Sequence, residues 1–313
     1  MKSFLKNYCR KFFNILYLLL ENLFLRWFLL RKPKYNKKYK ISICAIFKNE
    51  APFIKEWIEF HSLIGIEHFY MYNNNSEDNY KDILKPYIEK GIVTLIEWPY
   101  EQGQIKAYKD FYNQFRNETQ WVSFLDLDEF ICPKYDTHIM DWIKSYETYP
   151  VILIYWKMFG TSGKMNHDYS KLVIEQYTVS WDYLYNTGKC IINTDYEISE
   201  FNASVHHCTK VYYPILFSKI NLHPINASKI FVNHFKYILG LNNLGLDSIQ
   251  INHYWSKAWD VYNKKRFGTD VYFAKNPKQD ISYFIAHEKN NRTCDYTIFR
   301  YLMQLKHNMS NLI

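Results

Sequence analysis

The sequence predicts an α/β protein with a mostly parallel central sheet and flanking helices, preceded by an N-terminal helix that associates with a membrane. Three observations lead to this prediction. Apolar, β-branched runs alternate with amphipathic stretches from residue 40 onwards, which is the order of parallel strands joined by crossover helices. Polar residues follow three of the predicted strands. An apolar segment with basic flanks occupies residues 12–30.

The size and composition of the chain fit a globular fold. Its 313 residues, of which 48% are hydrophobic, suffice for one large domain or two small ones and exclude bulk disorder. The six cysteines form no CxxC pair, so free thiols are expected rather than a zinc site or a dense disulfide framework. We divide the chain into an N-terminal helix and linker (1–39), an α/β domain (40–270) and a C-terminal extension (271–313).

The N-terminal apolar segment has a length close to the roughly 20 residues that cross a bilayer. Glu21, Asn22 and Arg26 interrupt it, and charges at mid-membrane are costly. Its basic flanks suggest an anionic membrane surface. They comprise Lys2, Lys6, Arg10 and Lys11 on one side and Arg31, Lys32, Lys34, Lys37, Lys38 and Lys40 on the other.

For this segment we expect a helix in or on the membrane interface. A single span, and a helix packed on the protein's own core or on a partner, are the alternatives. The expected location is the cytoplasmic face of a membrane, with a Golgi-type anchor as the other choice. The formal charge of +8 does not indicate nucleic acid, because no recognition motif accompanies it.

The α/β domain begins with a regular succession of elements. Residues 40–47 are β-branched and apolar, as in a buried strand. Pro52 opens a helix that Gly65 ends, since proline suits the first turn of a helix and glycine its C-terminal stop. The same alternation predicts strands at 68–72, 92–97 and 121–125, and helices at 78–87 and 104–115.

Polar groups stand at the ends of three of these strands. They are Lys48, Asn49 and Glu50 after the first, Asn73 and Asn74 after the second, and Asp126 and Asp128 after the fourth. Open parallel sheets bind ligands beyond the carboxyl ends of their strands. These residues, distant in sequence, are therefore expected to converge on one edge.

The acidic motif Asp126-Leu127-Asp128-Glu129-Phe130 directly follows a buried strand. Carboxylates in such a place are costly unless their charge is compensated. A divalent cation provides that compensation, because Mg²⁺ and Mn²⁺ take carboxylate oxygens and substrate phosphates. A solvated acidic loop is the plainer interpretation of the same residues.

An ordered set of motifs runs through the chain: SICAIFKNEAPFIKEWIEFH (42–61), GIEHFYMYNNNSED (65–78), GIVTLIEWP (91–99), WVSFLDLDEF (121–130), WKMFGTSG (156–163) and NHYWSKAWDVYNKKRFG (252–268). Through these motifs the chain resembles glycosyltransferase family 92, and through its first half it resembles family 2-like bacterial glycosyltransferases. The resemblance covers about residues 41–270. It implies a GT-A fold, a nucleotide-sugar donor and an inverting mechanism.

The resemblance also implies roles for individual residues. The nucleotide pocket is expected to use Lys48, Asn49, Glu50, Asn73, Asn74, Gln104 and Asp126. The ligands expected for Mn²⁺ or Mg²⁺ are Asp126, Asp128 and His253, with His206 and His207 competing for the histidine position. Lys189 and Lys264 are candidates to meet phosphate charge, with solvated lysines as the plainer alternative.

An inverting transferase needs a general base that deprotonates the acceptor hydroxyl. Glu175 follows the loop Gly160-Thr161-Ser162-Gly163, where the acceptor lies in this fold, and is our candidate beside the catalytic Asp128. Asp168 and Glu129 are the other candidates.

The function expected from the resemblance is metal-dependent transfer of a hexosyl group from a UDP-type sugar to a glycan or glycolipid acceptor, in surface polysaccharide synthesis. One alternative is a membrane-surface binding protein with an inactive domain of this kind. The other is a nucleotidyltransferase. That class has a first loop rich in glycine and containing arginine, whereas KNEAPF contains neither.

Overall fold

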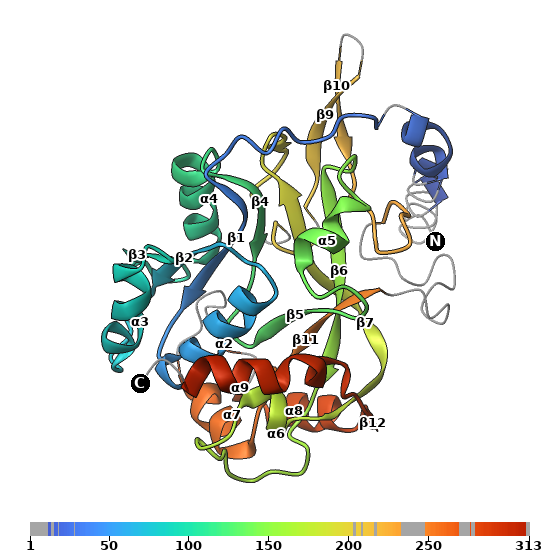
Figure 1. Ribbon diagram of the computed structural model, residues 1–313. Helices are drawn as coiled ribbons and strands as arrows, with labels where there is room; N and C mark the ends of the chain where they lie inside the picture. The colour runs from blue at the N-terminus through green and yellow to red at the C-terminus, as the bar shows by residue number, and fades with distance from the viewer. Residues whose placement is uncertain are drawn as a thin grey trace.

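A mixed sheet runs through the centre of the molecule (Figure 1). The computed structural model describes residues 12–13, 16–17, 19–27, 29–202, 205–207, 209–215, 218–232, 248–268, 276 and 279–310. Within them a nine-stranded sheet has the order β3-β2-β1-β4-β7-β6-β11-β5, and β12 pairs with β7.

The first half of the sheet is parallel and confirms the elements predicted between residues 40 and 125. Its strands are β1 (Tyr39–Phe47), β2 (His68–Asn73), β3 (Val93–Glu97) and β4 (Thr119–Phe124), and its helices are α2 (Ala51–Leu63), α3 (Tyr80–Glu89) and α4 (Gln104–Phe115). Strand β1 pairs in parallel with both β2 and β4. The carboxyl ends of these three strands therefore lie side by side.

The second half of the sheet corrects the prediction of a mostly parallel sheet. It contains β5 (Glu129–Pro133), β6 (Val151–Phe159), β7 (Val179–Asn193), β11 (Ile249–His253) and β12 (Asn291–Cys294). Strand β7 is antiparallel to β4, β6 and β12, and β11 is antiparallel to β5. The link from β6 to β7 holds only the four-residue helix α6 (Val173–Gln176), whereas parallel neighbours are usually joined by a longer crossover helix.

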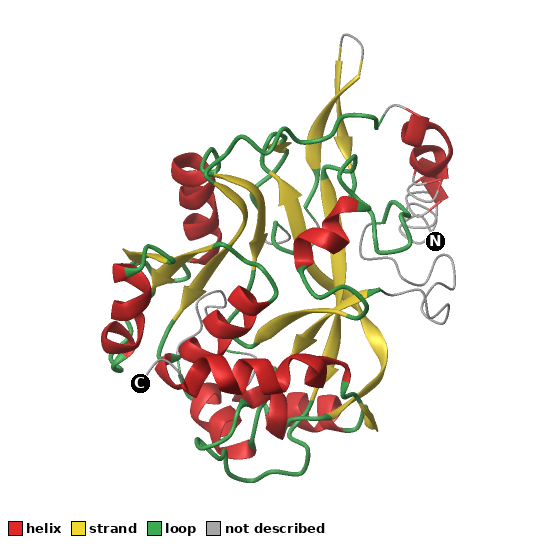
Figure 2. Cartoon of the chain, viewed as in Figure 1, coloured by secondary structure: helices red, strands yellow, loops and turns green. Residues whose placement is uncertain are grey.

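A second, three-stranded sheet lies at one side of the first. Its antiparallel strands are β8 (Glu197–Ile198), β9 (Val211–Ile215) and β10 (Ser218–Leu222). Figure 2 shows β9 and β10 extending away from the helices that surround the main sheet.

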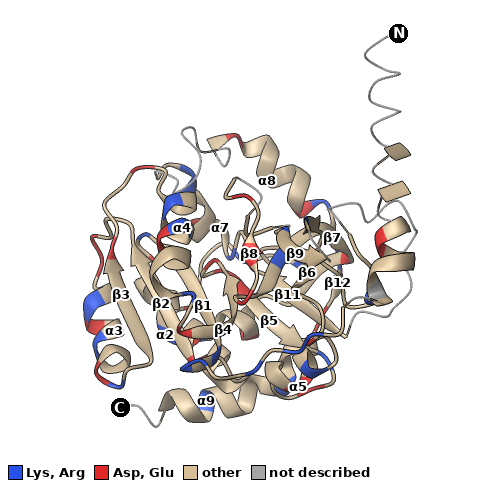
Figure 3. Ribbon diagram, turned by 90° about the horizontal axis from the view of Figure 1, so that it is seen from above, with Lys and Arg blue, Asp and Glu red and all other residues tan. Residues whose placement is uncertain are grey.

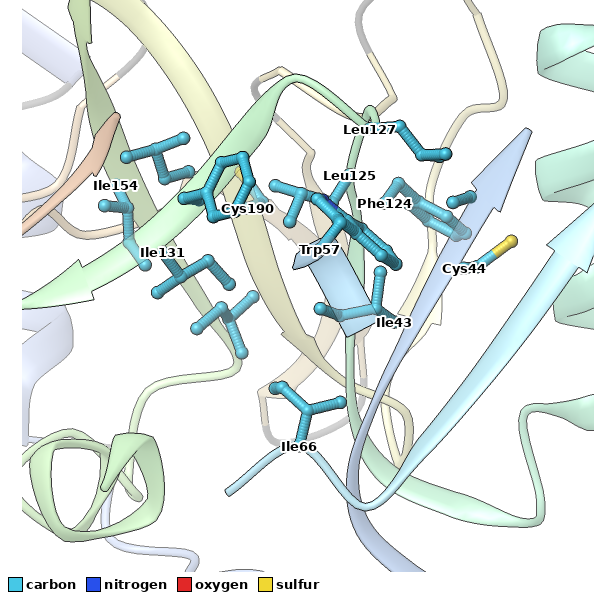
Figure 4. Packing of buried hydrophobic residues seen from close by; sticks show 14 of the residues in the cluster. Ile43, Cys44, Trp57, Ile66, Phe124, Leu125, Leu127, Ile131, Ile154 and Cys190 are labelled. Atoms are coloured by element: carbon cyan, nitrogen blue, oxygen red, sulfur yellow. The ribbon is translucent and has the colours of Figure 1, made fainter. Parts of the chain in front are cut away.

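Helix α2 packs on the core and fixes the strand that follows the acidic motif. The Trp57 side chain is completely buried and lies beside Ile43 and Leu125 (Figure 4). Its indole nitrogen donates to the Glu129 carbonyl at 2.9 Å, and the Ile131 N–H donates to His61 Nε2 at 3.3 Å. Residues four apart share one helix face, so both contacts reach the same strand.

The neutral state of His61 suits this arrangement. Its Nδ1 lies 2.8 Å from the Trp57 carbonyl, to which it can donate while Nε2 accepts. Burial lowers the pKa of His61 to about 3, against the opposing effect of that carbonyl. The ring therefore stays neutral at ordinary pH and keeps one nitrogen free to accept.

The predicted domain ends with α7 (Trp259–Arg266), and the extension after residue 270, for which the sequence predicts no role, packs on the same core. The described elements of this extension include α8 (Ile281–Glu288), the 3-10 helix η5 (Thr297–Tyr301) and α9 (Leu302–Ser310). Tyr301 donates its hydroxyl to the Pro133 carbonyl at 3.1 Å, and Lys55 donates to the Met309 carbonyl at 3.3 Å. The described part of the predicted extension therefore packs on the α/β domain.

The N-terminal segment is helical over the described residues between 12 and 24 and continues into the 3-10 turn η1 (Leu25–Trp27). In Figure 1 it stands at the edge of the molecule, on the side of β9 and β10. Among the described residues, no helix combines the length and apolar character needed to cross a membrane. Residues 1–11, which carry one of the basic flanks, lie outside the described residues.

Candidate functional site

The acidic motif forms a turn between β4 and β5. The Glu129 N–H donates to the Asp126 carbonyl at 3.1 Å, which closes the turn over Leu127 and Asp128. Leu127 is buried and anchors the turn in the core. The two aspartates thus leave the sheet at the edge where β1 and β2 also end.

Asp126 is held by a buried lysine and by a glutamine. Lys189 Nζ lies 2.7 Å from Asp126 Oδ2, and Gln104 Nε2 donates to Oδ1 at 3.2 Å. The Lys189 side chain is completely buried. Burial alone lowers its pKa, but the charges of Asp126 and Glu129 raise it above the ordinary lysine value. The solvated alternative for Lys189 is therefore wrong.

Glu129 supports the acidic turn from inside. Its side chain is completely buried, lies 3.4 Å from Lys189 and accepts the Asp126 N–H at 3.0 Å. Burial, with the charges of Asp126 and Asp128, raises its pKa well above the ordinary value, although Lys189 opposes the shift. In this arrangement a substrate hydroxyl does not reach Glu129, so its role is to position the turn.

Asp128 faces two cationic or metal-ligating side chains. His253 Nε2 lies 3.5 Å from Asp128 Oδ1, and Lys265 Nζ lies 3.8 Å from Oδ2. The Tyr254 N–H donates to the Asp128 carbonyl at 2.8 Å. Burial opposes ionisation, but the His253 hydrogen bond and the charge of Lys265 hold the pKa of Asp128 well below its usual range.

The register of β11 against β5 brings His253 to the acidic motif. His253 is the partner of Glu129 in this antiparallel pair, so the sequence candidate from the NHY motif does meet Asp128. The competing His206 is buried, and burial lowers its pKa well below the ordinary value. His207 instead contacts the Gly188 carbonyl at 2.9 Å.

Sequence analysis missed Lys265 and selected its exposed neighbour Lys264. Lys265 Nζ lies 2.5 Å from Glu50 Oε1, so it joins the loop after β1 to Asp128. Burial lowers its pKa, but Glu50 and Asp128 outweigh that effect and raise it, so the side chain stays charged. A signal was present, because Lys265 shares the helix face of the buried Val261 and Tyr262.

The structure brings together two of the three residues that the sequence predicts as metal ligands, Asp128 and His253. Mg²⁺ and Mn²⁺ often take one or two carboxylates and fill their other positions with water and phosphate oxygens. Asp128 and His253 face each other closely enough to share such a cation, with side chains 13% and 16% exposed. Asp126 instead directs its oxygens to Lys189 and Gln104. No cluster of three or more His, Cys, Asp or Glu ligands occurs in the described ranges.

The asparagines expected in the nucleotide pocket form hydrogen bonds to neighbouring loops. Asn49, at φ 54°, accepts the Glu77 N–H at 2.8 Å. Asn73 donates to Tyr80 and Glu97, and Asn74 donates to the carbonyls of Trp98 and Tyr100. Their side chains therefore fix the loops after β1, β2 and β3, while Lys48 and Glu50 are partly buried in the loop after β1.

Glu175 lies on α6, where Lys306 of α9 contacts it at 2.7 Å. Its Oε2 is buried and has no hydrogen-bond partner within the described structure. Glu175 forms no ion pair with the other candidate site residues in that part of the chain. Asp168, the exposed alternative, accepts from Ser170 and pairs with Lys171.

Three acidic side chains tether the loop that leads to Glu175. Glu56 of α2 accepts the N–H groups of Val173 and Ile174 at 2.7 and 3.0 Å. Asp260 accepts the N–H of His167 at 3.1 Å, and Glu288 accepts the hydroxyl of Thr161 at 2.8 Å. A side chain at Gly160 would overlap Asn291, which explains the glycine there.

The fold and this geometry define an α/β protein that gathers acidic and basic side chains where open α/β sheets bind ligands. Residues 37–289 match the sequence model of Glycosyltransferase family 92. The chain belongs to that family, which confirms the resemblance seen in the motifs.

The curated relatives are longer proteins. A glycosyltransferase family 92 protein of Oryza sativa subsp. japonica is 26% identical over 245 residues, covering 75% of this chain and 37% of the relative. A beta-1,4-galactosyltransferase of Caenorhabditis elegans is 36% identical over 109 residues, 30% of this chain and 26% of the relative. The chain thus spans well under half the length of each.

Solved structures overlap the chain only partly. TarS 1–349 of S. aureus in complex with UDP is 20% identical with a TM-score of 0.31, covering 41% of this chain and 38% of that one. Glucosyl-3-phosphoglycerate synthase from Mycobacterium tuberculosis, in complex with Mn²⁺, UDP and its product, is 16% identical with a TM-score of 0.28, covering 38% and 44%. The family assignment rests on the sequence match.

Proposed function

We propose that this chain is a metal-dependent inverting glycosyltransferase that moves a hexosyl group from a UDP-type sugar to a glycan or glycolipid acceptor. The chain belongs to a glycosyltransferase family, and one structural observation supports this activity. Asp128, His253 and Lys265 come from three different elements and meet at the carboxyl edge of the parallel strands. That arrangement suits the diphosphate of a nucleotide donor.

The residues of the site divide the chemistry between them. Asp128 and His253 would hold Mn²⁺ or Mg²⁺, which supplies positive charge to the diphosphate as the glycosidic bond breaks. Lys265 places a fixed positive charge beside them. Lys189 and Gln104 hold Asp126 in place. Asp126, whose side chain is 33% exposed, would bind a ribose hydroxyl of the donor.

Glu175 is the general base that we propose for the acceptor hydroxyl. Lys306 contacts one carboxylate oxygen of Glu175 at 2.7 Å and holds the side chain in place, while the Glu175 side chain as a whole is 26% exposed. Its Oε2 has no hydrogen-bond partner in the described structure. The tethers from Glu56, Asp260 and Glu288 fix the loop that carries it.

The names of the relatives guide the choice of substrates. The worm relative is a beta-1,4-galactosyltransferase, and one in Arabidopsis thaliana, 29% identical over 134 residues, is a galactan beta-1,4-galactosyltransferase. These names support a galactosyl or related hexosyl donor and a glycan acceptor. We further propose surface polysaccharide synthesis as the setting and the cytoplasmic face of a membrane as the location, with a Golgi-type anchor as the alternative.

Titration calorimetry with UDP, with and without Mn²⁺, tests the proposal. We expect binding that requires Mn²⁺ and is lost in Asp128→Ala but kept in Asp168→Ala, whose side chain is exposed and lies outside the site. Absence of UDP binding to the wild-type chain would refute the proposed function. Binding without hydrolysis or transfer of any UDP-sugar would favour an inactive binding domain, and release of pyrophosphate from a nucleoside triphosphate would favour a nucleotidyltransferase.

A further inference from the structure

The polar residues of the N-terminal helical segment are directed at the body of the protein. Glu21 is only 1% exposed, and its Oε2 lies 2.8 Å from His223 Nδ1. The Asn22 side chain binds the backbone of Phe231 in both directions, accepting its N–H at 3.0 Å and donating to its carbonyl at 3.4 Å. Two of the residues that make a membrane span costly, Glu21 and Asn22, thus attach the segment to the body of the protein.

The segment packs on β10 and on the residues that follow this strand. Tyr17 donates its hydroxyl to the Asn221 carbonyl at 3.0 Å, and its ring packs edge-on against His223 at 5.5 Å. Tyr17 and Glu21 are one helical turn apart and therefore share the inward face. The body-facing stripe of the segment is defined by these contacts.

The opposite face of the segment is apolar and exposed. Phe12, Leu16, Leu19, Leu23 and Trp27 follow one another at intervals of three or four residues, which puts them on one stripe. Their exposed fractions are 62%, 41%, 41%, 65% and 80%. An exposed apolar stripe of this extent marks an interaction surface.

The positive charges beside this apolar stripe indicate an anionic lipid surface as its partner. Lys6, Arg10 and Lys11 precede it in sequence, and Arg31 and Lys34 follow it with exposed side chains. Lysine and arginine beside an apolar helix face suit an anionic lipid surface, and tryptophan is favoured at the membrane interface. A second copy of the chain would bring the same positive charges together.

We propose that the stripe from Phe12 to Trp27 lies in the interface of an anionic lipid bilayer, with the segment parallel to the membrane plane. Its contacts through Tyr17, Glu21 and Asn22 then hold β10, the chain after it and the catalytic body against the membrane surface. Figure 3 shows the described part of this segment standing out from the rest of the molecule, where a flat surface can reach it. The proposal is independent of the chemistry of the site.

Vesicle flotation of the full-length chain tests this inference. Neutral phosphatidylcholine vesicles are compared with vesicles that also contain phosphatidylglycerol. We expect preferential binding to the anionic vesicles, which weakens as salt screens the basic flanks. Equal binding to both kinds of vesicle, or to neither, would overturn the proposal.

Leu23→Glu and Met303→Glu form a matched pair of variants. Both residues are exposed and apolar, at 65% and 76%, but Met303 lies on α9, away from the stripe. Leu23→Glu is expected to weaken vesicle binding at least about tenfold, since it removes an apolar group from the interface and adds a charge there. Met303→Glu is expected to bind as the wild type does. Equal binding by all three proteins would contradict the assignment.

Further measurements distinguish membrane-interface binding from two alternatives, which are an interface with a second copy of the chain and a membrane span. Lys34→Glu leaves the stripe intact and is expected to weaken binding to anionic vesicles roughly tenfold. Sedimentation equilibrium without vesicles should show the same mass for the wild type and Leu23→Glu. A dimer that Leu23→Glu converts to a monomer would make the stripe an interface between two copies. A chain that resists alkaline extraction from the vesicles would make the segment a span.

Discussion

Lys189 Nζ lies 2.7 Å from Asp126 Oδ2, and the lysine side chain is completely buried. The same nitrogen lies 3.4 Å from Glu129 Oε2. Much of the charge compensation that the acidic motif requires therefore comes from the chain itself. From the sequence alone, a divalent cation is expected to provide all of this charge compensation.

Replacing Lys189 should destabilise the fold severely. In Lys189→Met the buried carboxylate of Glu129 and the partly exposed carboxylate of Asp126 lose their partner; leaving a buried charge unpaired typically costs about 3–5 kcal/mol. Urea unfolding measures the loss. Lys264→Met, at an exposed lysine, should stay within about 0.5 kcal/mol of the wild type. Lys189→Met/Glu129→Gln should recover part of the stability, and no difference between the Lys189 and Lys264 variants would contradict the role of the buried lysine.

Lys265 is predicted to bind the diphosphate of the donor. In Lys265→Ala the affinity for UDP with Mn²⁺ should fall about tenfold or more, because a hydrogen bond to a charged group is worth about 1.5–3 kcal/mol. Uridine lacks the diphosphate, so its binding should not change. Calorimetry with both ligands measures the difference, with Lys264→Ala as the control. Equal losses for UDP and uridine would instead indicate damage to the pocket.

The sequence was sufficient for the parallel half of the sheet. Its strands and helices have clear periodicity and turn signals, and Asp126 and Asp128 stand at the predicted strand end. Local pattern could not predict that β7 runs antiparallel to β4, because strand pairing depends on connections rather than on the strand's own residues. The mostly parallel prediction failed for that reason.

Residues of the candidate site could be predicted only where they lie in a recognisable sequence motif. The NHY motif led to His253, which does face Asp128. The Glu175–Lys306 contact joins residues 131 positions apart, and the contact of Glu56 with Val173 spans 117. Glutamate on a helix ordinarily indicates a solvated face. Nothing local distinguishes Glu56, although it is buried and tethers α6.

Glu56 should make stability depend on pH. Burial raises its pKa to about 7, although the N–H groups of Val173 and Ile174 oppose the shift. An unfolded glutamate titrates near about 4.3. The folded state thus holds a proton that the unfolded state has lost. The stabilisation from Glu56 is therefore fully present below the pKa of the unfolded state, about 4.3. Above that pH its contribution to the free energy of unfolding falls by roughly 1 kcal/mol per pH unit, until the pH reaches the folded-state pKa of about 7.

The difference between the wild type and Glu56→Gln isolates this effect. Other groups, such as His61, titrate equally in both proteins and cancel. Urea unfolding between about pH 5 and pH 8 should show a falling difference in unfolding free energy across that window. Glu59→Gln, at a glutamate that accepts the hydroxyl of Tyr87, is the control on the same helix. A difference that is flat with pH would show that Glu56 titrates normally.

Glu175→Gln should separate donor binding from transfer. The amide keeps the shape of the side chain but cannot take a proton from the acceptor, and loss of a general base typically lowers the rate 10²–10⁴-fold. Calorimetry should give an unchanged affinity for UDP with Mn²⁺, while transfer from a UDP-sugar to a glycan acceptor should fall by about that factor. Asp168→Asn, at the exposed alternative on the same loop, should retain wild-type transfer. If Asp168→Asn lost transfer and Glu175→Gln kept it, the base would be Asp168, and the Lys306 contact would only hold α6 in place.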